Sequence, residues 1–91
     1  MKIICVCGLG QGSSLILKMS VEDVLNEAGV RAEVEHSDAS SVKMERCDYI
    51  VTTTGLEGAL EGSIGKVLVS NSFIDKKELR KVLTEGGIIT D

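Results

Sequence analysis

The chain has 91 residues, of which 43% are hydrophobic, 26% are charged and 10 are glycine, and it contains no proline. A chain of this length buries only about 60% of the surface that its unfolded form exposes, so residues 1–91 are expected to form a single domain with one small core. Acidic residues outnumber basic ones, 14 against 10, and aromatic residues make up only 2% of the chain. These values argue against a nucleic-acid-binding surface, which needs basic charge and stacking rings.

The cysteine count and the hydropathy pattern indicate where the protein is located and whether it binds a metal. Cys5, Cys7 and Cys47 are an odd number of cysteines and no secretory signal precedes them, so reduced thiols in the cytoplasm are expected. No apolar run approaches the roughly 20 residues that cross a bilayer, so membrane association should run through a partner. Three thiols and one histidine are too few for a zinc site, and no metal is expected.

The first two predicted elements are a buried strand and an amphipathic helix. Residues 2–7 are almost continuously apolar and β-branched, which is typical of a parallel strand buried on both faces. Apolar residues then recur at helical spacing over residues 14–28 and stop at Gly29. Either of the serines at the start of this pattern, Ser13 or Ser14, can cap the helix.

Strands and helices continue to alternate along the chain. The further predicted segments are, in order, a strand at 31–36, a short weak helix or loop at 38–46, a strand at 49–53, a glycine-studded segment at 55–65 with room for one helical turn, a strand at 66–69 and a helix at 75–85. The strand at 31–36 alternates apolar and acidic residues, which favours a place near a sheet edge. Asp75 and Glu78 form a capping pattern for the last helix, and Gly86 with Gly87 ends it. This alternation predicts a parallel sheet with right-handed crossovers, covered by helices.

The most informative segment joins the first strand to the first helix and reads Cys7-Gly8-Leu9-Gly10-Gln11-Gly12-Ser13-Ser14. Three alternate glycines let an anion approach the backbone N–H groups closely, and the start of a helix adds positive potential. In open α/β sheets, ligands bind beyond the carboxyl ends of the strands, where this loop is expected to lie. The segment therefore predicts a cradle for a phosphoryl group.

Cys7 is the candidate nucleophile of this loop. A cysteine with a pKa of about 8.5 is only about 3% thiolate at pH 7, whereas two units of depression make roughly three quarters of it thiolate. Such a shift takes about 2.7 kcal/mol, which one charge-assisted hydrogen bond together with a helix N-terminus can supply. Cys7 needs no histidine base on this interpretation. A tight turn with a half-buried cysteine explains the glycines equally well.

Other phosphate-binding loops match these residues less well. The dinucleotide fingerprint needs glycine where Ser13 stands, and a Walker A loop needs lysine before its serine. A cysteine phosphatase of the C-x5-R type needs arginine at the position of Ser13. Two alternatives to a phosphoryl carrier remain open: a non-catalytic module that binds a nucleotide or another anion, and a small cysteine phosphatase.

The loop resembles the phosphorylation loop of IIB subunits of the bacterial phosphoenolpyruvate-dependent sugar phosphotransferase system (PTS). It is most similar to the L-ascorbate type, whose loop reads C-G-x-G-x-G-S-S. The resemblance implies a three-layer, flavodoxin- or Rossmann-like α/β fold, an open sheet of four parallel strands in the order 2-1-3-4 with helices on both faces. It further implies a phosphotransferase in which Cys7 accepts phosphoryl from a phosphohistidine on the IIA protein. Cys7 then passes the group to a sugar, L-ascorbate or a related one, at the membrane IIC permease.

The resemblance also assigns the phosphate-binding residues and the setting. The cradle would consist of Gly8, Leu9, Gly10, Gln11, Gly12, Ser13 and Ser14. No cofactor or metal is implied. The protein is expected to be cytoplasmic, to reach the inner membrane only through the permease, and to be a monomer when isolated.

Further polar residues and cysteines have two interpretations each. Cys5 is expected in the core, and Cys47 is expected to be a buried small hydrophobe. His36 ends a strand, where a solvated side chain is the default and a role in the site is the alternative. Two clusters that carry hydroxyl groups lie at strand ends: Thr52–Thr54 end the third predicted strand, and Ser70–Ser72 follow the fourth. They rim the site or serve only strand and turn.

Overall fold

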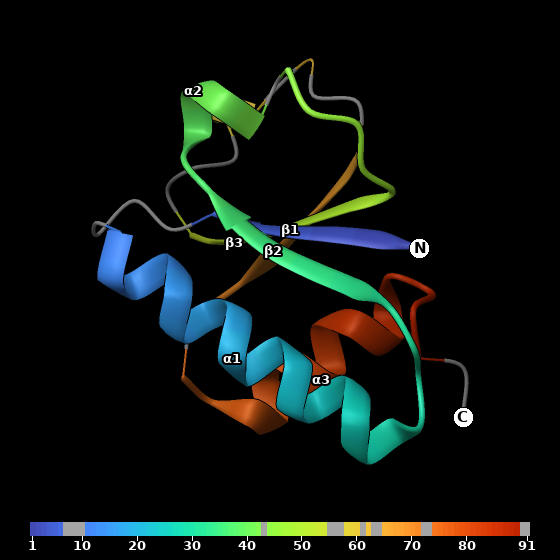
Figure 1. Ribbon diagram of the computed structural model, residues 1–91. Coiled ribbons are helices and arrows are strands. Elements are labelled where there is room, and N and C mark those ends of the chain that lie inside the picture. Colours follow the sequence, from blue (N-terminus) through green and yellow to red (C-terminus); the bar gives the residue numbers. More distant parts are fainter. Residues whose placement is uncertain are drawn as a thin grey trace.

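The computed structural model describes residues 1–6, 11–42, 44–54, 58–60, 62, 65–71 and 74–89. Within them, four parallel strands form one open sheet in the order β2-β1-β3-β4 (Figure 1). The strands are β1 (Lys2–Val6), β2 (Glu33–Ser37), β3 (Tyr49–Thr53) and β4 (Lys66–Ser70). The expected α/β fold and its strand order are confirmed.

Helices cover both faces of the sheet, as expected. Helices α1 (Gln11–Ala28) and α3 (Lys76–Glu85) lie side by side on one face, and the short α2 (Ala39–Val42) lies over the other (Figure 1). A 3-10 turn, η1 (Gly58–Leu60), occupies part of the glycine-studded segment and packs with α2. The three layers are therefore unequal, with the long helices all on one side.

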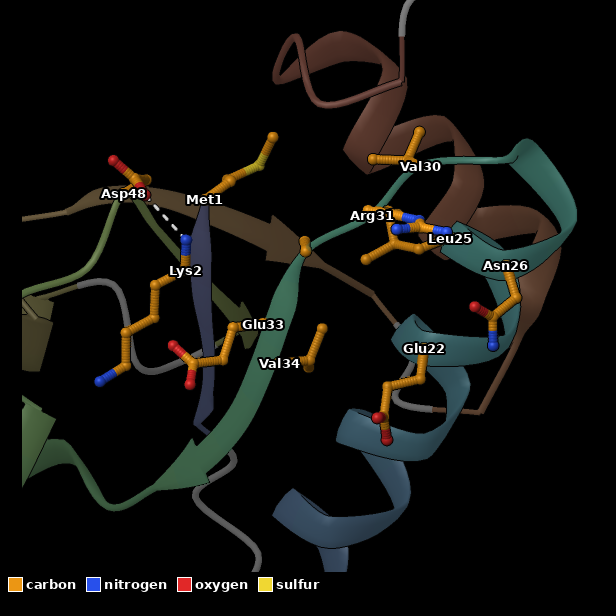
Figure 2. A pocket seen from close by; sticks show the side chains of 11 residues that line it. Met1, Lys2, Glu22, Leu25, Asn26, Val30, Arg31, Glu33, Val34 and Asp48 are labelled. Carbon is orange, nitrogen blue, oxygen red and sulfur yellow. Dashed lines mark hydrogen bonds between the residues drawn. The ribbon is translucent and has the colours of Figure 1, made fainter.

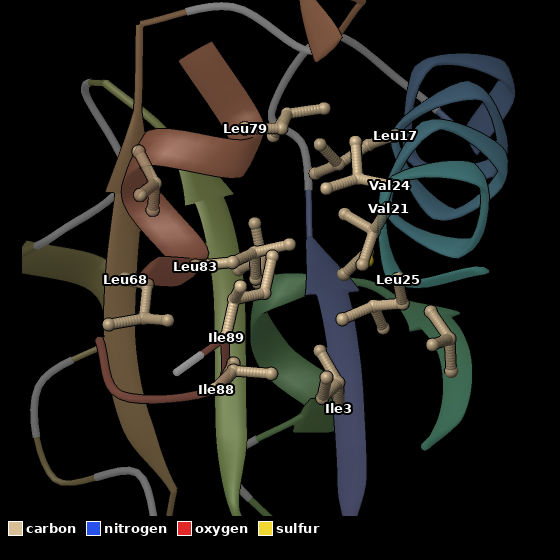
Figure 3. Close-up of a cluster of buried hydrophobic side chains, with 14 residues drawn as sticks. Ile3, Leu17, Val21, Val24, Leu25, Leu68, Leu79, Leu83, Ile88 and Ile89 are labelled. Carbon is tan, nitrogen blue, oxygen red and sulfur yellow. The ribbon is translucent and has the colours of Figure 1, made fainter. Parts of the chain in front are cut away.

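Alternate residues of β1 supply the two cores. Ile3 and Cys5 join the larger core under α1 and α3, which Figure 3 shows, while Ile4 and Val6 join the smaller core under α2 and η1. All four of these side chains are at most 1% exposed. Strand β1 is thus buried on both faces, as its unbroken apolar sequence predicts.

Strand β2 is an edge strand, as its alternation predicts, but it begins later than expected. Pairing with β1 starts at Lys2 opposite Glu33, so residues 31–32 belong to the connection. Only Val34 of this strand is buried. On the solvent side, Lys2 Nζ forms an ion pair with Glu35 at 3.2 Å.

Helix α1 begins at Gln11, three residues before the predicted start. Ser13 and Ser14 therefore lie inside the helix, and the prediction that one of them is the N-cap is wrong. The apolar periodicity does not reach the polar first turn, which is why it placed the start too late. The helix ends at Ala28, and Gly29 follows with a φ of 73°, a left-handed conformation suited to glycine.

Helix α3 has the ends that its sequence predicts. The Asp75 carboxylate accepts hydrogen bonds from the N–H groups of Lys77 and Glu78, at 3.0 and 3.4 Å. The helix runs to Glu85, and Gly87 beyond it has a φ of 89°. The cap and the glycine stop set the ends of this helix, while its buried residues Leu79, Val82 and Leu83 hold it against the same sheet face as α1.

Candidate functional site

The two ends of the glycine loop lie at the carboxyl edge of the sheet. The chain leaves β1 through α1 toward β2 on one side, and later returns to β3 on the other side of β1. The carboxyl ends of β1 and β3 therefore form a topological switch point, where ligands bind in open α/β sheets. Strand β1 ends at Val6 and α1 begins at Gln11, so the intervening loop starts and finishes at this point.

The predicted nucleophile and three of the seven predicted cradle residues lie outside the described residues. These are Cys7, Gly8, Leu9 and Gly10. The remaining cradle residues form the start of α1, from Gln11 through Gly12 and Ser13 to Ser14. Backbone N–H groups in the first turn of a helix have no acceptor within the helix, so they can donate to an anion at this edge.

Ser14 lies on the helix face that packs against the sheet. Its side chain is 3% exposed, and Leu17 and Val21 continue the same buried face along the helix. The Ser14 hydroxyl lies 3.3 Å from Nδ1 of His36. The buried Ser14 hydroxyl therefore links the first turn of α1 to β2.

His36 reaches this position through the register of the sheet. It pairs with Cys5 of β1, one residue before β2 ends, and lies on the same side of its strand as Val34, which packs under α1. The side chain is exposed, as the default interpretation expects. The contact with Ser14 nevertheless brings the His36 side chain to a predicted cradle residue. No local pattern in the sequence could indicate this contact.

Hydroxyl groups also gather where β3 and β4 end. Thr52 is opposite Val6 in the register and fully buried, and Thr53 is opposite Ser70, which is also fully buried. The N–H of Thr54 donates to the carbonyl of Ser70 at 3.2 Å. Within the described part of the chain, Thr52 Oγ1 has no hydrogen-bond partner. The structure therefore places one unsatisfied buried hydroxyl beside the residue that precedes Cys7.

The rest of the cluster after β4 has a different orientation. Asn71 is exposed, and its Nδ2 donates to Glu78 Oε1 of α3 at 3.4 Å. This contact gives Asn71 a partner in α3. Ser72 lies outside the described residues.

Two of the three cysteines can be assigned from their surroundings. Cys5 is fully buried, and burial raises the pKa of its thiol to about 12, so it remains protonated at neutral pH. Its predicted place in the core is confirmed. Cys47 is only half-buried, because it lies in the connection before β3 against Gly65, but burial raises its pKa as well. Neither thiol is suited to act as a nucleophile at neutral pH.

A cavity of about 740 Å³ opens at the opposite edge of the sheet (Figure 2). Glu22 and Asn26 border it from α1, and Lys2 and Glu33 border it from the starts of β1 and β2. The N–H of Lys2 donates to Asp48 there at 2.7 Å. The cavity lies at the amino ends of the strands, away from the switch point, and its lining carries charges of both signs. It does not form part of the candidate site.

Neither a metal centre nor a membrane-spanning helix is found in the described residues. In that part of the chain, no group of three or more His, Cys, Asp and Glu side chains could hold a metal ion. No helix there is long and apolar enough to span a bilayer.

Relatives of known function match most of the chain. The family model described as PTS system, Lactose/Cellobiose specific IIB subunit, matches residues 2–85. The ascorbate-specific PTS system EIIB component of Salmonella choleraesuis (strain SC-B67) is 33% identical over 70 residues, which are 75% of this chain and 69% of the relative. The protein of the same name from Mycoplasma pneumoniae is 29% identical over 86 residues, covering 91% and 90% of the two chains.

A solved structure gives the same fold. The lactose-specific IIB component domain from Streptococcus pneumoniae superposes on this chain with a TM-score of 0.67 at 16% identity, covering 100% of this chain and 98% of that one. The shared architecture is Rossmann- or flavodoxin-like. Because the family model spans nearly the whole sequence, this chain belongs to the IIB subunits of the phosphotransferase system, which are phosphotransferases that work with IIA and IIC partners.

Proposed function

We propose that the protein is a phosphocysteine carrier. The Cys7 thiolate attacks the phosphorus of a phosphohistidine on IIA, the N–P bond breaks, and the imidazole nitrogen keeps its electron pair. In the second step a sugar hydroxyl at IIC attacks the same phosphorus, its proton is lost, and the S–P bond breaks to restore the thiolate. One observation carries this proposal: the cysteine-led glycine loop joins β1 to the first turn of α1 at the topological switch point.

The cradle would stabilise both transfers through the backbone. Cys7 would be followed by the cradle residues Gly8, Leu9, Gly10, Gln11, Gly12, Ser13 and Ser14. Their N–H groups would hold the equatorial phosphoryl oxygens, whose charge has to be stabilised in an in-line transfer. The same donors would lower the pKa of the thiol, so no general base is needed.

The proposed sugar is L-ascorbate or a related one. The curated relatives carry ascorbate-specific names, and the Gln-Gly-Ser-Ser half of the loop favours the same type. The family model instead carries a lactose/cellobiose description, so the ascorbate assignment is supported by the named relatives and the loop residues alone. The proposed site of action is the cytoplasmic side of the permease.

Exposed apolar side chains on α1 suit the docking of IIA, which must bring its phosphohistidine to Cys7. Leu15, Ile16 and Met19 are 44%, 44% and 57% exposed, and they lie in the amino-terminal half of α1. Apolar side chains of this size gain free energy when a partner covers them. We name this group the α1 apolar patch.

Substitution of Met19 by glutamate tests the patch. The variant Met19→Glu is expected to raise the IIA concentration needed for half-maximal phosphorylation by roughly tenfold, because a charge must be desolvated on docking. Asn26→Glu is the matched control: it adds the same charge to an exposed position of α1 near the amino edge of the sheet. Equal effects of the two variants, or an effect of Met19→Glu on delivery to IIC alone, would contradict docking of IIA at this patch.

Phosphoryl acceptance is the decisive test of the proposed function. The protein is incubated with phosphoenolpyruvate, the general phosphotransfer proteins and the IIA protein, and its intact mass is measured at neutral pH. One covalent phosphoryl group is expected, whereas an anion-binding module would acquire none. A phosphatase would instead hydrolyse an aryl phosphate in the steady state, which is expected to be negligible because Ser13 stands where the phosphate-binding arginine would be needed.

A further inference from the structure

His36 contacts Ser14 of the predicted cradle, but the proposed function assigns His36 no role. His36 is the single histidine of the chain. Its Nδ1 lies 3.3 Å from Ser14 Oγ, although the two residues are 22 positions apart and come from different elements. The Ser14 side chain is buried at the start of α1, whereas the imidazole is open to solvent.

Either Ser14 Oγ or His36 Nδ1 can be the donor of this hydrogen bond, and the choice decides where the Ser14 proton points. A serine hydroxyl has one proton to donate and can accept from other groups. If Nδ1 carries no proton, it accepts the Ser14 proton. If Nδ1 carries a proton, it donates to Ser14 Oγ, and the Ser14 hydroxyl can direct its own proton elsewhere.

We propose that His36 is a positioning residue that sets the direction of the Ser14 hydroxyl, donating from Nδ1 to Ser14 when a phosphoryl group occupies the loop. Ser14 then donates its proton to a phosphoryl oxygen. This inference rests on the proposed function, in which Ser14 belongs to the phosphate cradle. His36 itself need not touch the phosphoryl group.

The ionisable groups described around the imidazole have another partner, keep their proton or are exposed. On α1, one turn beyond Ser14, Lys18 Nζ is 3.2 Å from Glu22 Oε1, so its charge is already partnered. Cys5, which pairs with His36 in the sheet, keeps its proton at neutral pH. On β2, Glu35 pairs with Lys2 on the opposite side of the strand. The next charged residue along the chain, Asp38, is exposed.

Nitrogen NMR of the single histidine reads the direction of the contact. In 15N-labelled protein, the Nδ1 signal is expected to move toward the position of a protonated nitrogen when the loop is phosphorylated by IIA and phosphoenolpyruvate. The Ser14→Ala variant is expected to lose this coupling between phosphorylation and Nδ1. An Nδ1 signal that does not change on phosphorylation, or that changes equally in Ser14→Ala, would overturn the inference.

Substitutions of His36 separate positioning from simple packing. His36→Ala is expected to slow phosphoryl acceptance by roughly tenfold, the value of one hydrogen bond to a charged group, without changing the IIA concentration for half-maximal rate. His36→Asn should restore most of the rate, since its amide places an N–H donor near the position of Nδ1. His36→Gln, whose amide lies one carbon further out, should not.

A double substitution tests whether His36 acts through Ser14. In the Ser14→Ala background, His36→Ala is expected to have no further effect on the rate, because the hydroxyl that it orients is absent. Additive effects, or equal rates for the Ala, Asn and Gln variants, would refute the positioning role while leaving the carrier function intact. If the unaltered protein itself acquires no phosphoryl group, the proposed function fails, and this inference fails with it.

Discussion

Replacing Cys7 by serine is expected to abolish phosphoryl acceptance, lowering its rate by about 10³-fold or more. A cysteine supplies an appreciable fraction of thiolate near neutral pH, and the N–H groups of the loop would increase that fraction. A serine hydroxyl stays protonated under the same conditions and needs a general base. The carrier mechanism assigns no general base to this site. The serine hydroxyl therefore stays unreactive, although it fits into the space of the thiol.

Matched variants at the other two cysteines identify the acceptor atom. Cys47→Ser removes a half-buried thiol outside the site and is expected to leave acceptance unchanged. Cys5→Ser should also remain competent, although its hydroxyl would be fully buried and cost about 1–3 kcal/mol of stability if unpartnered. Intact mass and peptide mapping locate the phosphoryl group. Phosphoryl on Cys7→Ser, or its loss from Cys47→Ser, would refute the assignment.

The fold was predictable because its signals are local. Strand β3 lies at the predicted residues 49–53, and α3 has the predicted aspartate cap, since alternation and capping depend on neighbouring residues. The start of α1 was missed because Gln11 and Gly12 contribute no apolar periodicity. From the sequence alone, a polar first turn that follows a glycine loop is read as a continuation of that loop.

The candidate site was predictable only where a motif marks it. The loop motif indicates Cys7 and its cradle, and these assignments remain predictions. The Ser14–His36 contact and the unsatisfied Thr52 hydroxyl depend instead on the register of β1 with its two neighbours. Register is a property of the assembled sheet, so side chains distant in the sequence meet only once it has formed.

Truncation of Leu17 is expected to cause a large loss of stability. Leu17 is fully buried in the core between α1, α3 and the sheet, where Figure 3 shows it close to Leu79. Leu17→Ala removes its buried methyl groups and leaves a cavity, at a cost of about 2–5 kcal/mol. Small domains have a total stability of about 5–15 kcal/mol, so this single change removes a large part of it.

The same substitution two residues earlier provides the control. Leu15 is 44% exposed, so Leu15→Ala should change the free energy of unfolding by less than about 0.5 kcal/mol. Urea unfolding monitored by circular dichroism should show a lower midpoint for Leu17→Ala with an unchanged slope, because both variants expose a similar amount of surface when they unfold. Equal midpoints for the two variants would contradict the packing of α1 described above. Because Ser14 lies one turn before Leu17 on the same buried face, the stability of this core also determines how firmly the start of α1 is held at the switch point.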